Sequence, residues 1–148
     1  MESIQYRSIV SCAAATPIYI AAKLMAKNKV SCLFVTDDLG KIIGYVTDIT
    51  MRDKVVATIS NANNPVISIV DKPVVSISTQ AYVYEAILMM FRTKTRYLLI
   101  EENGEYIGFQ SRNKLLSEHA QSPLVFIQSV KSATTVGELK RSGKKYLR

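Results

Sequence analysis

The sequence predicts an α/β (α+β) fold made of two copies of one unit, packed with pseudo-twofold symmetry. The first observation is a repeat: residues 16–53 and 81–118 follow the same order of apolar and polar stretches, and Gly44 matches Gly108 at an offset of 64 residues. The second observation is that each copy reads as helix, strand, turn, strand, helix. Because a unit that cannot bury its apolar face alone packs on its neighbour, we expect the copies to share one compact body.

In the first copy, residues 8–15 form an apolar, extended lead-in. Thr16 is the expected cap of a helix with Pro17 in its first turn, and apolar side chains follow at helical spacing. Residues 32–36 and 42–46 predict a strand pair around a turn at Gly40, which tolerates positive φ. Thr47 is expected to open a helix that runs to about residue 60.

The second copy repeats this order after an Asn-rich linker, residues 60–65, and a short helical turn over 65–70. A lead-in strand is expected at 73–78, and a helix then presents an apolar face formed by Val83, Ala86, Ile87 and Met90. Strands are expected over 97–101 and 106–110. Asn103-Gly104 between them is a strong type I′ turn signal, because both central positions need positive φ. Ser111 caps the last helix, which ends near His119.

We assign residues 1–62 to the first repeat, 63–120 to the second, and 121–148 to a helical, basic tail. The segment SPLVFIQSVKSA predicts an amphipathic helix, and the tail has no partner copy. We therefore expect the chain to be part of a longer protein in which the tail leads into a further domain.

The charge lies mainly in that tail. Six basic residues and one acid between Lys131 and Arg148 carry +5 of the net +7, which leaves +2 for the 130 residues before them. The body therefore lacks the basic face of a nucleic-acid-binding protein, and a solvated charged end is the favoured interpretation of the tail. Contact with a polyanion through the tail is the weaker alternative.

Other bulk features indicate a cytoplasmic protein. No apolar run approaches the ~20 residues of a membrane span, and the N-terminus shows no signal-peptide pattern. Cys12 and Cys32 sit in apolar stretches and are expected to be buried thiols in a reducing compartment.

The order and repetition of these motifs resemble a tandem pair of CBS domains, the module named after cystathionine β-synthase, over residues 8–120. The tail, with Ser122-Pro123-Leu124 and Gly137-Glu138-Leu139, is similar to the segment after such a pair in bacterial signal-transduction proteins that also carry a cyclic-nucleotide-binding domain. The residues that carry the main resemblance are Thr16-Pro17-Ile18, Ala21-Ala22 with Met25, Cys32 to Val35, Gly44-Tyr45-Val46-Thr47, Glu85-Ala86 with Met90, Arg96 to Leu99, and Gly108-Phe109-Gln110-Ser111.

The resemblance implies regulation of an attached effector domain, a homodimer formed through the CBS helices, and an adenine nucleotide in a cleft between repeats. The ligands it implies are AMP, ADP or ATP, and in some relatives S-adenosylmethionine, with no cofactor required. The alternative function is a structural or dimerisation module that has lost its ligand. The nucleotide-binding residues carried over from the resemblance are Thr16, Tyr45, Thr47, Thr50, Arg96, Phe109, Ser111 and Lys114.

The family's ligand motif is only half kept. Thr47 and Ser111 match its hydroxyl residue, which holds phosphate at the positive end of a helix. Thr50 and Lys114 stand where the family has an Asp that binds the ribose hydroxyls. Losing charge-assisted hydrogen bonds of about 1.5–3 kcal/mol weakens nucleotide binding by about one to two decades. Lys114 instead suits a phosphate or another anion.

Structural roles remain open for the same residues. Thr16, Thr47 and Ser111 can act as helix caps alone. Arg96 is either a surface charge or an anion contact, and Tyr45 and Phe109 either pack in the core or stack on a base. Catalysis is not expected, because His119 is the only histidine and lies in a polar run, and no glycine-rich phosphate loop or zinc-ligand set is present.

Overall fold

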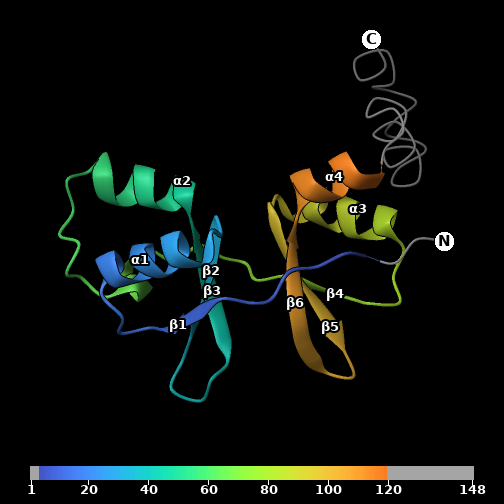
Figure 1. The fold of residues 1–148 in the computed structure, drawn as a ribbon, viewed down its shortest axis with the longest axis horizontal. Helices are drawn as coiled ribbons and strands as arrows, with labels where there is room; N and C mark the ends of the chain where they lie inside the picture. Colours follow the sequence, from blue (N-terminus) through green and yellow to red (C-terminus); the bar gives the residue numbers. More distant parts are fainter. Residues whose placement is uncertain (1–3, 120–148) are drawn as a thin grey trace, which may run out of the picture. The chain divides into compact units, whose positions relative to one another are not determined.

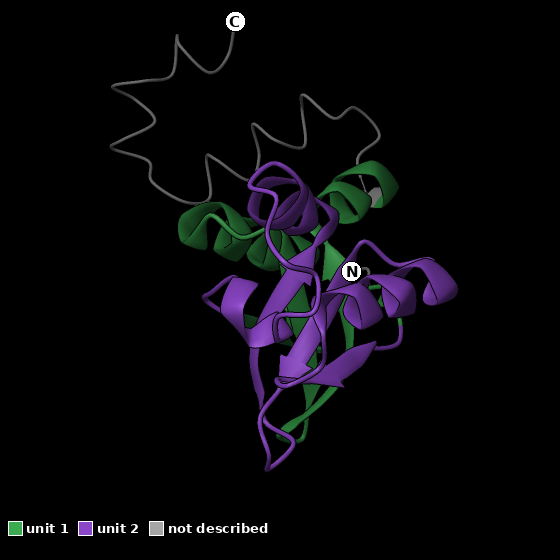
Figure 2. Cartoon of the chain, turned by 90° about the vertical axis from the view of Figure 1, so that its left-hand side faces the viewer, with its two compact units in different colours: residues 1–7, 75–148 green, residues 8–74 purple. Residues whose placement is uncertain are grey.

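The computed structural model describes residues 4–119, which divide into two compact units (Figures 1 and 2). The first-repeat unit is Ser8–Val74. Of the described residues, the second-repeat unit combines 75–119 with 4–7, so the segment near the start of the chain belongs with the second repeat. The sequence bounds proposed above for the two repeats and the tail stay predictions, as does the pseudo-twofold packing.

The first-repeat unit is a three-stranded sheet with helices attached (Figure 1). The sheet order is β1-β2-β3, with β1 parallel to β2 and β3 antiparallel to it. Its elements are β1 (Ser11–Ala13), α1 (Ile18–Asn28), β2 (Cys32–Thr36), β3 (Ile42–Thr47), α2 (Asp48–Met51), a π-helix (Arg52–Val56) and a 3-10 helix (Val66–Ile69).

The second-repeat unit repeats this topology, which confirms the predicted duplication. Its sheet order is β4-β5-β6, again with one parallel and one antiparallel pairing. Asn103 and Gly104 both have positive φ in the turn between β5 and β6, as predicted. The elements are β4 (Ser76–Ser78), α3 (Val83–Thr93), β5 (Tyr97–Glu102), β6 (Glu105–Ser111) and α4 (Arg112–His119).

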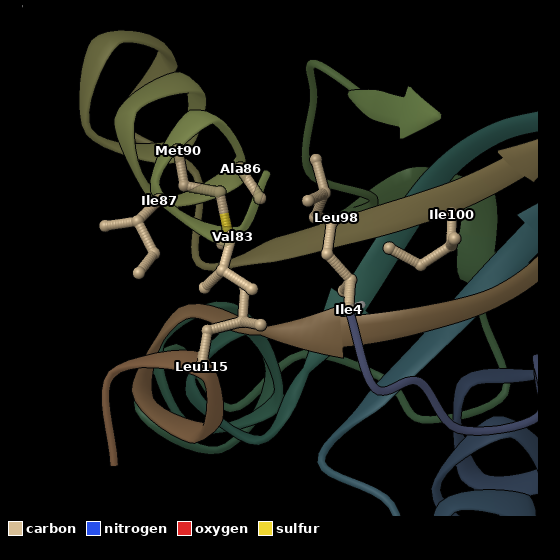
Figure 3. Packing of buried hydrophobic residues seen from close by; sticks show 8 residues of the cluster. All are labelled: Ile4, Val83, Ala86, Ile87, Met90, Leu98, Ile100 and Leu115. Atoms are coloured by element: carbon tan, nitrogen blue, oxygen red, sulfur yellow. The ribbon is translucent and has the colours of Figure 1, made fainter. Parts of the chain in front are cut away.

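The core of the second-repeat unit lies between α3, α4 and the sheet (Figure 3). The four apolar residues predicted from the α3 spacing are all in it, which follows from their 3.6-residue periodicity. Ile4 joins them from the start of the chain and is 5% exposed. The cluster consists of Ile4, Val83, Ala86, Ile87, Met90, Leu98, Ile100 and Leu115.

In each unit, the free edge of the last strand pairs with a short segment from just before one of the repeats: the segment at Arg7 pairs with β6, and the segment at Asp71 pairs with β3. Arg7 and Phe109 exchange backbone hydrogen bonds of 2.8 and 2.9 Å, and Asp71 and Tyr45 exchange bonds of 2.7 and 3.2 Å. The repeat glycine makes room for this segment. A Cβ on Gly108 would lie 2.2 Å from the Tyr6 ring. Such a Cβ would also lie 2.7 Å from the Arg7 carbonyl oxygen, and a Cβ on Gly44 would lie 2.9 Å from the Val70 Cβ, so both repeat glycines sit where a side chain would crowd the paired segment.

Three local predictions differ from the structure. The N-cap of α1 is Pro17, with no side-chain capping bond, so Thr16 is not the cap that was expected. The helix after Thr47 is one α-helical turn followed by a π-helix that ends at Val56, earlier than residue 60. The lead-in strand over 73–78 is regular only from Ser76.

The structure also bears on the expected absence of a membrane span and on the two cysteines. The helices of residues 4–119 lack the length and apolarity that crossing a lipid bilayer requires. The helix predicted from residue 121 onward lies outside the described residues. Cys32 is buried as expected, whereas Cys12 is half-buried.

Candidate functional site

Thr47 and Thr50 form a reciprocal capping box where β3 meets α2. The Thr50 N–H donates to Thr47 Oγ1 at 3.1 Å, and the Thr47 N–H donates to Thr50 Oγ1 at 3.0 Å. Both side chains are buried, at 6% and 3% exposure. Two orphan backbone donors are thus satisfied. Thr50, which stands at the position of the expected Asp, takes over the backbone contact that a carboxylate at this position makes in a capping box.

A carboxylate from elsewhere in the unit reaches the same place. The Thr50 hydroxyl donates a hydrogen bond to Asp71 Oδ2, and Lys54 Nζ lies 2.9 Å from Asp71 Oδ1. Lys54 also donates to the Ile69 carbonyl at 3.3 Å. We call Thr47, Thr50, Lys54 and Asp71 the Asp71 cluster. It joins a helix start, a carboxylate and an ammonium group within one compact unit.

The equivalent place in the second-repeat unit has different chemistry. Ser111 Oγ accepts from the Lys114 N–H at 3.1 Å, so Ser111 caps α4 as predicted. Lys114 Nζ lies 3.2 Å from Glu118 Oε1, one turn along the same helix. The Arg112 N–H donates to the Arg96 carbonyl at 2.9 Å, and the Arg112 guanidinium lies 4.7 Å from the centre of the Phe91 ring.

Residues 64 positions apart are equivalent in the two repeats, and at two of these positions the equivalent side chains have opposite charges. Asp71 and Arg7 are equivalent, because each pairs with the same position of the last strand. Lys54 corresponds to Glu118, and Thr50 corresponds to Lys114. The first repeat therefore has a carboxylate at position 71, next to its capping hydroxyl, where the second repeat has Arg7.

The two aromatic residues of the predicted site lie in the interior. Tyr45 is 9% exposed with its ring centre 6.4 Å from that of Phe34, and Phe109 is 3% exposed and 6.5 Å from Tyr97. These tilted pairs favour the packing role. Arg96 is exposed at the start of β5.

Thr16 belongs to another neighbourhood of the first-repeat unit. Its N–H donates to the Ala13 carbonyl at 3.0 Å, and its own carbonyl accepts from the Val66 N–H at 2.7 Å. Burial raises the pKa of the Cys12 thiol, and a hydrogen bond with the Thr16 side chain partly opposes that rise. Tyr45, Thr47 and Thr50 thus stand together on one strand–helix junction, and Thr16 has different recorded partners.

Sequence reasoning missed Lys54 and Asp71. Asp71 lies 21 residues after Thr50 and is outside any local motif. The only sequence signal for it is the internal repeat, which aligns the segment before Pro73 with the start of the chain. Residues 4–119 contain no group of three or more His, Cys, Asp or Glu side chains placed to hold a metal ion.

Comparison with known proteins identifies the family. The CBS domain model matches residues 2–57 and 66–119. The chain belongs to the CBS domain family. The two matches follow the two copies of the sequence repeat, so the chain carries a tandem CBS pair.

Individual relatives carry the same module. CBS domain-containing protein CBSCBSPB1 of Arabidopsis thaliana is 32% identical over 104 residues, which cover 70% of this chain and 19% of that protein. The chain thus spans about one-fifth of that relative's length.

Solved CBS structures superpose on the chain. The CBS domain protein PAE2072 from Pyrobaculum aerophilum, complexed with AMP, has a TM-score of 0.70 at 22% identity and covers 84% of this chain and 95% of its own. A CBS-domain protein from Burkholderia ambifaria, provisionally assigned to signal transduction, has a TM-score of 0.67 at 25% identity and covers 79% of this chain and 86% of its own.

Proposed function

We propose that this CBS pair is a regulatory module that binds an adenine nucleotide and thereby modulates an attached effector domain. The observation that carries the proposal is the Asp71 cluster, in which a hydroxyl at a helix start lies in a chain of hydrogen bonds with a carboxylate. Those groups suit the phosphate and the sugar of a nucleotide. AMP in the Pyrobaculum structure supports the choice of ligand class.

The proposed mechanism is a shift of equilibrium. A nucleotide that binds one arrangement of the module better than another favours that arrangement, by no more than the difference in binding free energy. The attached domain then senses this arrangement, directly or through a homodimer formed by the CBS helices. The residues proposed to contact nucleotide remain Thr16, Tyr45, Thr47, Thr50, Arg96, Phe109, Ser111 and Lys114.

The second candidate function is a dimerisation module without a ligand. The observation that favours it is in the second-repeat unit, where Lys114 stands at the position of the expected Asp and is paired with Glu118. If both repeats have lost their ligand, purified protein will form a stable dimer whose dissociation constant does not respond to nucleotides.

A thermal-shift screen tests the proposed function. The full chain is heated with AMP, ADP, ATP, S-adenosylmethionine or NADH at about 1 mM, since a ligand that binds only the folded state raises the unfolding midpoint by mass action. We expect a rise with one of the adenine nucleotides that is lost in Thr47→Ala. Ser111→Ala removes the equivalent hydroxyl of the second repeat, and a loss of the rise in that variant would indicate that the second repeat contacts the nucleotide. The absence of a rise with all five ligands would favour the dimerisation module.

A further inference from the structure

Within residues 4–119, Asp71 has more hydrogen-bonding capacity than its two side-chain partners use. An ionised carboxylate offers about four acceptor positions. The recorded partners of its two oxygens are the Thr50 hydroxyl on one and Lys54 on the other. The Asp71 side chain is 34% exposed, so solvent and ligands reach the remaining acceptor positions.

The position of this carboxylate is fixed by the backbone. Asp71 and Tyr45 exchange two backbone hydrogen bonds, and Tyr45 lies two residues before Thr47 on the same strand. Val70, the residue before Asp71, is so close to Gly44 that a Cβ there would lie 2.9 Å from the Val70 Cβ. The carboxylate is therefore held beside the start of α2 before any ligand arrives.

The residue at position 50 suits this arrangement. A second carboxylate at this position would face Asp71 across a hydrogen-bond distance, and like charges that close disfavour ionisation of both. The neutral Thr50 hydroxyl instead donates a hydrogen bond to Asp71. Thr50 and Asp71 are therefore compatible neighbours, where two carboxylates would repel each other.

We propose that Asp71 accepts hydrogen bonds from the vicinal 2′ and 3′ hydroxyls of the ribose, and that the first-repeat unit is the one that takes the nucleotide. This inference rests on the proposed function above. Two hydroxyl donors on adjacent carbons match the paired oxygens of a carboxylate, and such charge-assisted bonds are about twice as strong as neutral ones.

The second-repeat unit lacks this acceptor. Its residue equivalent to Asp71 is Arg7, and its residue equivalent to Thr50 is Lys114. Arginine and lysine side chains are donors only, so neither accepts from a sugar hydroxyl. At these positions, therefore, the first-repeat unit has a carboxylate that can accept from the ribose hydroxyls, whereas the second-repeat unit has only donors.

The test compares two ligands that differ only in the sugar. Calorimetric titration of the full chain with AMP and with 2′,3′-dideoxy-AMP isolates the contribution of the two hydroxyls. We expect AMP to bind at least about 10- to 100-fold more tightly, the range given by one charge-assisted hydrogen bond. In Asp71→Asn this preference should fall to within about threefold, because a neutral amide oxygen is the weaker acceptor.

Two further variants keep the test specific. Asp53→Asn removes an aspartate of the same unit that pairs with exposed Arg52, and it should retain the full preference for AMP. Asp71→Glu keeps the charge but moves the carboxylate by one methylene, and it should weaken AMP binding while leaving the dideoxy ligand unchanged. Circular dichroism of each variant verifies that it is folded.

The outcomes separate the two proposals. If AMP binds with no preference over the dideoxy ligand, or if Asp71→Asn keeps the preference, the role of Asp71 is wrong and the proposed function stands. If neither ligand binds to the wild-type chain, the proposed function is wrong and the role of Asp71 is wrong with it.

Discussion

The Cys32 thiol lies at the first position of β2 with no exposed surface. Burial raises its pKa well above the ordinary value, and the nearby negative charges of Asp48 and Asp71 add to the rise. The unfolded chain releases this proton near pH 8.5, while the folded chain retains it. The thiol therefore favours the folded state below that pH and progressively less above it.

We expect the free energy of unfolding to fall above about pH 8.5, with Cys32 contributing about 1.4 kcal/mol per pH unit. Urea titrations at several pH values between 8 and 10 measure this slope. Cys32→Ala is the control, and its slope should be shallower by that amount although it is less stable at every pH. Equal slopes in the two proteins would show that Cys32 does not contribute.

Single residues of the site could be placed from sequence only where a local rule governs them. Thr47 and Ser111 were correctly expected to cap helices, because a hydroxyl between a strand and a helix has few other roles. Asp71 could not be found in this way, since its partner Thr50 is 21 residues earlier and the chain must fold back to join them.

At the scale of elements, the pairing of residues 4–7 with β6 depends on Gly108. A Cβ there would lie 2.2 Å from Tyr6 and 2.7 Å from the Arg7 carbonyl oxygen. One of these contacts is with backbone, so a rotamer change of Tyr6 cannot relieve both. The segment over residues 4–7 has to move away if position 108 carries a side chain.

Gly108→Ala is therefore expected to destabilise the chain by about 1–3 kcal/mol, the range for an overpacked site. Hydrogen exchange at the amides of Arg7 and Phe109, which bond each other, should accelerate. Gly104→Ala is the matched control: its φ of +81° makes alanine strained, but no atom lies within 4 Å of the added Cβ. If both variants leave the Arg7 amide protected, Gly108 does not control this pairing.

The elements themselves were largely predictable, since periodicity and turn residues are local. The strands β2, β3, β5 and β6 and the Asn103-Gly104 turn agree with expectation. The cap of α1 does not, because the Thr16 carbonyl pairs with Val66 from a distant segment. The π-helix after Met51 was also missed, since no apolar period distinguishes it from an α-helix.

At the scale of the whole molecule, the units do not follow the order of the repeats. The first-repeat unit extends to Val74 and excludes residues 1–7. Its interior includes Val66 and Ile69, which are 0% and 6% exposed. A division of the chain at the end of the first repeat would remove both from the unit that buries them.

Two fragments test this organisation. The fragment of residues 8–74 should give a cooperative urea transition, whereas the fragment of residues 1–62 should not. Burial of each missing apolar side chain is worth about 1.5–3 kcal/mol, a large share of the stability of so small a domain. If both fragments gave nuclear magnetic resonance spectra of equal dispersion, residues 63–74 would not be needed to fold the first-repeat unit, and this organisation would be wrong.

Because the first residues belong to the second-repeat unit, the two units become complete at different stages of synthesis. Gln110 donates to the Gln5 carbonyl across 105 residues of chain, which gives this unit contacts of very high sequence separation. Residues 8–74 form one compact unit, and that unit is fully synthesised once Val74 leaves the ribosome. Residues 4–7 must wait for Phe109, so this segment stays without its strand partner through most of synthesis and is exposed to pairing with other chains.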